Sequence, residues 1–159
     1  MPKQTRQIDI IRFLRTGREL LGIPIGMTRE NLISKLGPPI DEVGEGNFSF
    51  IYYKGGVRFF QENNVIVELG LDFNVGGRVV SFPIKIEDME NVKYFNYNTK
   101  LNVAIKMLKY LRIKWSSWDE NNPGNIVLKT ASDVFLLFDI DDGKIGRIIY
   151  RGPITKAAS

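Results

Sequence analysis

The sequence predicts an α+β fold built as a tandem repeat of a helix plus an antiparallel β-meander, with an additional N-terminal helix. Three observations lead to this prediction: a capped helix over residues 28–36, strand-like runs joined by short turns after it, and the same order of elements in the second half. The expected units are an N-terminal amphipathic helix over 1–21, a first repeat over 22–90 and a second repeat over 91–159, packed as one compact unit.

The first helix is predicted from an apolar stripe at helical spacing, made by Ile10, Ile11, Leu14 and Leu21. Most of the net charge of +4 lies in the same stretch, since residues 1–21 hold five Lys and Arg against two Asp and Glu, a difference of 5 − 2 = +3. Its candidate nucleic-acid-binding residues are Arg12, Arg15 and Arg18. The alternative is an ordinary solvated basic face on a docking helix, since no DNA- or RNA-binding motif accompanies these arginines.

The second helix has a start signal and a stop signal. Thr28 can accept a hydrogen bond from the first free amides, and Gly37 followed by two prolines ends the helix. Leu32 and Leu36 fall on one face. We therefore expect a short amphipathic helix over 28–36 that packs on a sheet.

Runs rich in Phe, Tyr, Ile and Val follow this helix and predict strands at 48–53, 57–61 and 65–73. Short turns make them antiparallel neighbours. Strict alternation in the third strand predicts that Val67 and Leu69 face the core and that Glu68 faces the partly wet side. Residues 78–86 are expected to add a fourth strand, and residues 87–98 an irregular connector.

The second half repeats the plan with a helix capped by Thr99, whose apolar face includes Leu108. Strands are expected at 113–118, 126–130, 134–140 and 145–150. Thr28 aligns with Thr99, Leu32 with Val103, Leu36 with Met107, and residues 57–60 with residues 134–137. This order is what a duplication would leave, and a chance succession of helix and hairpins is the alternative.

The string from Gly26 through Thr28, Leu32 and Leu36 to Pro39, leading into aromatic strands, resembles the repeat of the β-lactamase-inhibitor-protein-like superfamily. That superfamily also includes small outer-membrane assembly lipoproteins. The resemblance implies a helix laid on an antiparallel sheet, often duplicated, and an activity of protein binding. The lipid-anchoring cysteine and the disulfides of those members are absent here, so neither β-lactamase inhibition nor envelope assembly is implied. The repeat is also similar in general look to uncharacterised bacterial immunity partners of toxins.

Composition excludes several classes of chemistry. A chain of 159 residues with 43% hydrophobic residues can bury one sizeable core. It has no Cys and no His, which excludes disulfides, thiolate zinc sites, cysteine nucleophiles and the ordinary serine-protease triad. The polar N-terminus and the charges after it predict neither a secretory signal nor a membrane span, so we expect a cytoplasmic protein.

The acidic residues give no clear catalytic or metal site. Residues 139–143 read Asp-Ile-Asp-Asp-Gly, but the sixth and twelfth positions of a calcium loop would be Lys144 and Tyr150, so a hairpin turn is expected. Glu68 and Asp72 on one strand would lie about 13 Å apart, too far for a glycosidase-type pair. We therefore expect no cofactor, no metal and no enzyme. The alternative is carboxylate chemistry assembled by tertiary structure.

The candidate partner-binding residues are aromatic and charged side chains expected on one sheet surface, namely Tyr53, Arg58, Glu68, Trp118 and Arg147. Trp115 and Trp118 should point to opposite faces of their strand. The alternative buries both tryptophans under residues 91–98. Residues 93–97, which interleave Lys with aromatics, could stack bases of single-stranded nucleic acid or pack on the core.

The sequence thus predicts a protein-binding module, of inhibitor or immunity type, that binds a protein partner of unknown identity through a sheet face. Two alternatives stay open: a nucleic-acid-binding protein that uses the N-terminal helix, and an enzyme. No membrane partner is expected.

Overall fold

The fold is α+β, with three helices and one large, mostly antiparallel sheet of eight strands among the residues described. The structure is a computed structural model and describes residues 9–73, 81–84, 93–118 and 123–152. The helices are α1 (Ile10–Thr16), α2 (Arg29–Leu36) and α3 (Leu101–Tyr110). A short 3₁₀ turn, η1 (Lys54–Gly56), joins two of the strands.

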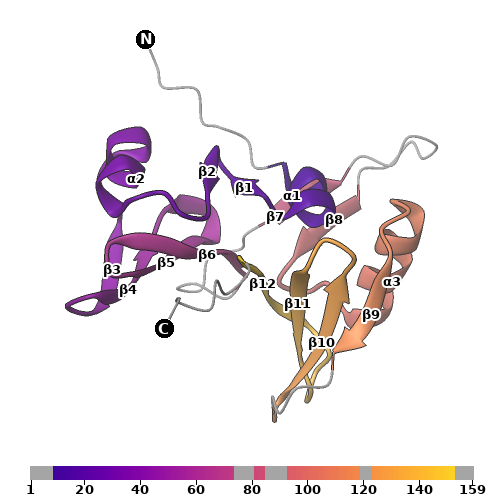
Figure 1. Cartoon of the computed structure of the whole chain (residues 1–159). Coiled ribbons are helices and arrows are strands. Elements are labelled where there is room, and N and C mark those ends of the chain that lie inside the picture. Colours follow the sequence, from indigo (N-terminus) through magenta and orange to yellow (C-terminus); the bar gives the residue numbers. More distant parts are fainter. Residues whose placement is uncertain (1–8, 74–80, 85–92, 119–122, 153–159) are drawn as a thin grey trace, which may run out of the picture.

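The large sheet consists of two four-stranded meanders whose last strands pair with each other. Its strands, in order across the sheet, are β3 (Asp41–Glu45), β4 (Phe48–Tyr52), β5 (Val57–Glu62), β6 (Val65–Asp72), β12 (Ile145–Arg151), β11 (Val134–Asp139), β10 (Asn125–Thr130) and β9 (Trp115–Trp118). β6 and β12 are antiparallel and join the two meanders. Twist accumulates from strand to strand, so the strands of the two meanders run in clearly different directions (Figure 1).

Two small hairpins lie outside the large sheet. β1 (Glu19–Leu20) pairs with β2 (Ile23–Pro24), and β7 (Ser81–Ile84) pairs with β8 (Lys93–Asn96). The predicted fourth strand over 78–86 is therefore wrong in its pairing, because 81–84 joins β8 instead of the first meander. The predicted irregular connector is also wrong over 93–96, which forms β8; residues 74–80, 85–92 and 119–122 lie outside the described part.

In the described part of the predicted helix over 1–21, which begins at residue 9, only Ile10–Thr16 is helical; residues 1–8 lie outside the described part. Asp9 accepts a hydrogen bond from the amide of Arg12 at 2.9 Å and begins the helix, and Gly17 ends it in the left-handed region at φ 60°. Phe13, which the predicted stripe omitted, is buried with Ile10 and Leu14. The chain after Gly17 turns into β1, so Leu21 does not belong to the helix.

The prediction for α2 is confirmed, and the predicted cap of α3 is wrong. The Thr28 hydroxyl accepts from the amide of Asn31 at 3.2 Å. In α3 the N-cap is Lys100, which makes no side-chain cap, and the Thr99 hydroxyl instead accepts from the amide of Asn96 at 3.0 Å. The predicted helix is present, but its cap is one residue later than the threonine.

A β-bulge corrects the predicted alternation in β6. Phe60 pairs with Glu68 and Gln61 pairs with Ile66, so Val67 is the additional residue. The bulge places Ile66 in the core, fully buried, while Val67 is only half-buried. Glu68 and Leu69 still point to opposite faces of the sheet, as the alternation after the bulge requires.

The second meander has a bulge at the corresponding place, because Leu137 pairs with Arg147 and Phe138 pairs with Ile145, which leaves Gly146 as the additional residue. Hydrogen bonds at the start of each helix also correspond. The amide of Arg29 donates to the carbonyl of Asn64, and that of Leu101 donates to Gly143; likewise Ile66 donates to Met27, and Ile145 to Thr99. Each helix start is thus bonded to the chain beside the last strand of its own meander.

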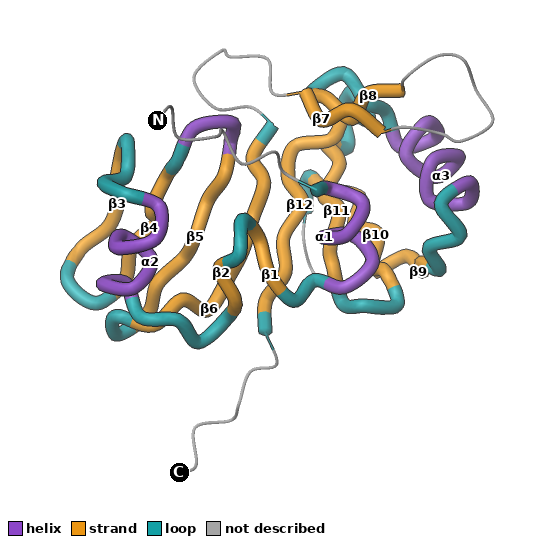
Figure 2. The backbone as a smooth tube through the Cα atoms, turned by 90° about the horizontal axis from the view of Figure 1, so that it is seen from above, coloured by secondary structure: helices purple, strands orange, loops and turns teal. Residues whose placement is uncertain are grey.

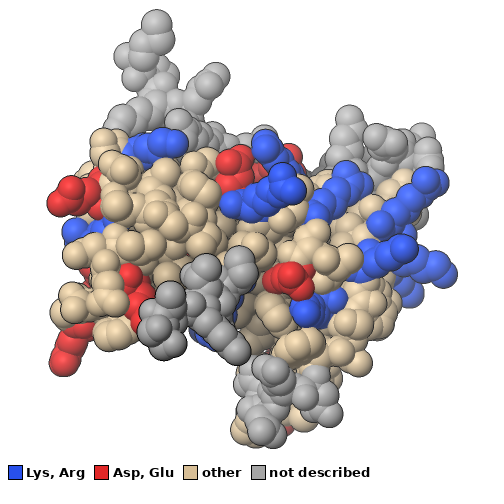
Figure 3. Space-filling view, in the orientation of Figure 1, with Lys and Arg blue, Asp and Glu red and all other residues tan. Residues whose placement is uncertain are grey.

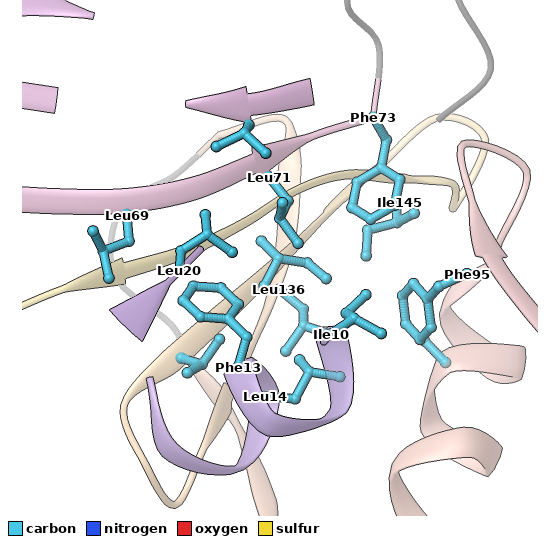
Figure 4. Close-up of a cluster of buried hydrophobic side chains, with 14 of the residues drawn as sticks. Ile10, Phe13, Leu14, Leu20, Leu69, Leu71, Phe73, Phe95, Leu136 and Ile145 are labelled. Atoms are coloured by element: carbon cyan, nitrogen blue, oxygen red, sulfur yellow. The ribbon is translucent and has the colours of Figure 1, made fainter. Parts of the chain in front are cut away.

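All three helices pack on the same face of the large sheet. One cluster contains α1 (Phe13, Leu14), α2 (Leu32), α3 (Ala104, Leu108) and alternate residues of the strands. Figure 2 shows α2 in front of the first meander and α1 in front of the second. Figure 4 shows the side chains of α1 beside Leu20 of β1 and Leu136 of β11, in one cluster with Leu69 and Leu71 of β6 and Phe95 of β8.

Candidate functional site: a hollow on the open face of the sheet

The face of the sheet opposite the helices carries a hollow of about 800 Å³. Side chains from seven of the eight strands line it, including Phe50, Arg58, Glu68, Trp118, Val127, Lys129, Phe135, Leu137, Arg147, Ile149 and Arg151. Strand alternation places them there: in β11, Val134, Leu136 and Phe138 are fully buried under the helices, whereas Phe135 and Leu137 are half-buried on the other face.

An aromatic cluster forms one end of the hollow. The rings of Trp118 and Phe135 meet edge to face with centroids 5.7 Å apart. Lys129 Nζ lies 4.3 Å from the centroid of Trp118, within cation–π range, and 3.1 Å from the carboxylate of Asp133. These contacts hold Trp118 in a defined position although its side chain is only half-buried.

A buried ion pair lies in the middle of the hollow. Arg58 Nη2 donates to Glu68 Oε1 at 2.7 Å, and Arg151 Nε donates to Glu68 Oε2 at 2.7 Å. The Arg58 guanidinium also lies 4.5 Å from the ring centroid of Phe50. Arg58 Nε is buried and has no hydrogen-bond acceptor among the described residues.

The acids of the central ion pairs are covered and two of the arginines are accessible. Glu68 is 3% exposed against 67% for its partner Arg151, and Asp72 is 14% exposed against 42% for its partner Arg147, 3.5 Å away. The middle of the hollow therefore presents guanidinium groups to solvent, with their carboxylates beneath.

Four of the five predicted partner-binding residues lie together in this hollow, namely Arg58, Glu68, Trp118 and Arg147. Two of them differ from the prediction in exposure: the side chains of Arg58 and Glu68 are 4% and 3% exposed, because they pair with each other under Phe50 and Arg151. They form the bottom of the hollow.

The fifth predicted residue, Tyr53, lies on the helix side and is 9% exposed. Its hydroxyl donates to the carbonyl of Gly37 at 2.9 Å, and burial raises its pKa. Tyr53 therefore does not lie on the predicted sheet surface, because the alternation that points Phe50 outward points Tyr53 inward.

The two tryptophans point to opposite faces, as predicted. Trp115 pairs with Thr130, a core-facing residue, and Trp118 pairs with Val127 on the open face. Trp115 is 38% exposed and Trp118 is half-buried, so the alternative in which both are buried is wrong.

The prediction omitted Phe135, Lys129 and Arg151. A signal for Phe135 was present in the sequence, because residues 134–138 read Val-Phe-Leu-Leu-Phe, with apolar residues on both faces. A strand whose second face is apolar must be covered on that face or present it to a ligand.

The predicted nucleic-acid-binding arginines are mostly engaged within the molecule. Arg15 Nη2 donates to the carbonyl of Leu111, just after α3, at 3.1 Å. Arg12 forms an exposed ion pair with Glu19 at 3.3 Å. Arg18 follows the end of α1 and is exposed. The three side chains therefore do not form one regular basic helical face.

A second polar network stabilises the edge of the first meander. Arg29 of α2 forms two hydrogen bonds with Glu42 of β3, at 3.1 and 2.6 Å, and Ser49 donates to Glu42 at 2.7 Å. Gln61 in turn donates to Ser49 at 2.9 Å. The hydrogen bonds from Arg29, which have the larger effect, and the one from Ser49 hold the pKa of Glu42 below its usual value despite partial burial.

Neither a metal site nor a calcium loop is found in the described residues. No group of three or more acidic side chains there is arranged to hold a metal ion. Residues 139–143 form the predicted turn between β11 and β12, in which the Gly143 amide donates to the carbonyl of Asp139 at 2.8 Å.

Charge is separated along the molecule. Figure 3 shows acidic side chains at the end that holds α2 and β3, and Lys and Arg side chains around α3 at the other end. α3 itself carries the exposed Lys106 and Lys109. The basic surface on α3 is separate from the arginines of the hollow, because no residue of α3 lines the hollow.

Comparison of the chain with protein-family models, with curated proteins and with solved structures finds no match. In the part of the chain that the structure describes, no helix has both the length and the apolar character needed to cross a membrane.

Proposed function

We propose that this chain is a cytoplasmic protein-binding module that holds its partner in the hollow on the open face of the sheet, and that it acts by binding, as an inhibitor or immunity protein does, without catalysis. The observation that supports the proposal is the composition of the open face of the sheet. Helices cover one side of the sheet, while the other combines Trp118, Phe135 and Leu137 with accessible arginines.

The aromatic end of the hollow has the character of an interface hot spot. Interfaces are enriched in Trp, aromatic residues and Arg, and few anchors supply most of the binding energy. Trp118 is held by Phe135 and Lys129 before any partner arrives. Such preorganisation reduces the entropy that binding must overcome.

We also propose that the two halves are copies of one helix-plus-meander unit. Equivalent bulges support this, and so do the equivalent hydrogen bonds that relate residue 29 to 101, 27 to 99, 64 to 143 and 66 to 145. The matching isolated bridges are Thr28 to Val65 and Lys100 to Lys144. These bridges align Thr28 with Lys100, whereas the sequence analysis aligned Thr28 with Thr99, one residue earlier. The hollow lies across the junction of the two copies.

Site-specific photo-crosslinking in the native host tests the binding face. We would place a benzophenone amino acid at Phe135, in the hollow, and as a matched control at Val103, which is 40% exposed on α3. We expect one protein to be crosslinked from position 135 and not from position 103. That protein, once purified, should bind the wild type, and Trp118→Ala should weaken binding by about thirtyfold, as loss of a 2 kcal/mol anchor does.

Two results would contradict the proposal. One is the same set of crosslinked proteins from both positions. The other is a purified partner whose affinity is unchanged by Trp118→Ala and by Phe135→Ala, while a small metabolite raises the melting temperature of the protein.

A further inference from the structure

We infer that the segment bound in the hollow is an acidic stretch of polypeptide, whose carboxylates meet Arg147 and Arg151 and whose apolar side chains meet Trp118 and Phe135. This inference rests on the proposed function and adds the chemistry of the partner. It follows from the accessible charge, the extent of the hollow and the arrangement of its arginines and aromatic side chains.

The accessible charge in the middle of the hollow is positive. Arg151 and Arg147 are 67% and 42% exposed, whereas the carboxylates that pair with them, Glu68 and Asp72, are 3% and 14% exposed. Glu68 is shared between Arg151 and the buried Arg58, so this group of three carries one positive charge in excess. An approaching carboxylate meets guanidinium donors first, and an approaching cation meets the same groups and is repelled.

The extent of the hollow favours a polypeptide over a small metabolite. Its lining reaches from Phe50 in β4 to Trp118 in β9, across seven neighbouring strands. Strands lie about 4.8 Å apart, so six intervals span up to about 29 Å along the sheet, the length of about nine extended residues. The volume of about 800 Å³ is also found in small-molecule pockets, so it is the length of the hollow that favours a polypeptide.

The charged and aromatic parts occur in a fixed order. Arg147 and Arg151 lie four residues apart on β12, and so about 13 Å apart along the strand. Trp118 and Phe135 lie on the side of β12 toward the edge strand β9. The complementary ligand therefore has at least two carboxylates beside an aromatic or aliphatic side chain.

Selection from a displayed library of random peptides, about nine residues or longer, tests the inference without knowledge of the natural partner. We expect the immobilised wild-type protein to select peptides rich in Asp and Glu next to an apolar residue. A synthetic peptide from the selection should bind in solution with an affinity that falls as salt is added. Arg147→Gln with Arg151→Gln should weaken that binding by about tenfold or more, and Lys at both positions should largely retain it.

The matched control is Lys106→Gln with Lys109→Gln on α3, which removes the same charge from the opposite side of the sheet and should leave peptide binding unchanged. Melting curves of all variants establish that they are folded. Equal losses for the hollow and α3 variants would overturn the inference, since attraction to net positive charge would then be sufficient.

The remaining outcomes separate this inference from the proposed function. Selected peptides without acidic residues, whose binding is lost with Trp118→Ala, would overturn the acidic partner and leave the binding face supported. Selected peptides that are insensitive to both Trp118→Ala and the double arginine variant bind elsewhere, and would overturn both.

Discussion

Arg58 Nη2 donates a 2.7 Å hydrogen bond to Glu68 Oε1, and the two side chains are 4% and 3% exposed. They come from neighbouring strands of the first meander and form the bottom of the hollow. A buried pair of this kind is costly to break, because the remaining charge keeps its desolvation cost without its partner.

The first prediction concerns this pair. Glu68→Ala leaves Arg58 buried without its carboxylate and should lower the free energy of unfolding by about 3–5 kcal/mol. Asp133→Asn is the control, because Asp133 is 64% exposed in its pair with Lys129, Asn tolerates its φ of 62°, and loss of the charge should cost about 1 kcal/mol or less. Urea denaturation at neutral pH measures both. Similar costs for the two variants would show that the Arg58–Glu68 pair adds no more than a surface pair.

The second prediction concerns the contact between the helices and the sheet. Leu32 and Leu108 are both fully buried, so Leu32→Ala and Leu108→Ala should each cost about 2–5 kcal/mol. Leu36, which the sequence analysis aligned with Met107 in the second repeat, is only half-buried and should cost less. Chemical denaturation of the three variants gives the order. A larger cost at Leu36 than at Leu32 would contradict the observed orientation of α2.

The third prediction concerns the end of α1. Gly17 has φ 60°, and a Cβ there would be 2.5 Å from a ring carbon of Tyr150. Gly17→Ala should therefore lower the melting temperature by more than Gly46→Ala, where φ is 56° and no atom lies within 4 Å of the added Cβ. The difference between the variants isolates the clash from the backbone strain. Equal shifts would mean that the Tyr150 ring moves aside freely.

The fourth prediction concerns pH. Hydrogen bonds from Arg29 hold the pKa of Glu42 below its usual value, so the unfolded chain binds the proton more readily than the folded one. This stabilisation is complete above the ordinary carboxylate pKa of about 4.3 and is lost as pH falls through the lower folded pKa.

Glu42→Gln should therefore destabilise the protein at neutral pH, with the gap to wild type narrowing in acid. Urea denaturation over a pH series measures this gap. Glu45→Gln, an exposed position on the same strand, is the control. A gap that stays constant down to the lowest pH at which the protein folds would rule out the proposed linkage.

Local signals in the sequence were sufficient for the elements whose hydrogen bonds are made within a few residues. The Thr28 cap and the Gly37 stop define α2, and the turn at 139–143 separates two apolar strands. Gly17 is an equally local signal for the end of α1, and the helical spacing of Leu21, which lies beyond it, is coincidental. Strands rich in aromatic and β-branched residues were placed within about one or two residues for the same reason.

Pairings between distant segments were decided only by the tertiary structure. β3 reads Asp-Glu-Val-Gly-Glu, consists of residues that lie at the surface and has no strand-like composition, yet it pairs along the edge of β4. Residues 81–84 pair with β8 and not with the sheet. The sequence contains both strands of each pair, but no interaction between residues close in the sequence determines which strands pair with each other.

The site divides in the same way. Composition and alternation placed four of the five predicted residues, Arg58, Glu68, Trp118 and Arg147, on one surface, because every second residue of a strand shares a face. Burial of Arg58 and Glu68, accessibility of Arg147 and Arg151, and the inward turn of Tyr53 follow from the register between strands and from which face the helices cover. Those are long-range choices, made when the two meanders join at β6 and β12, and residue spacing within one strand does not contain them.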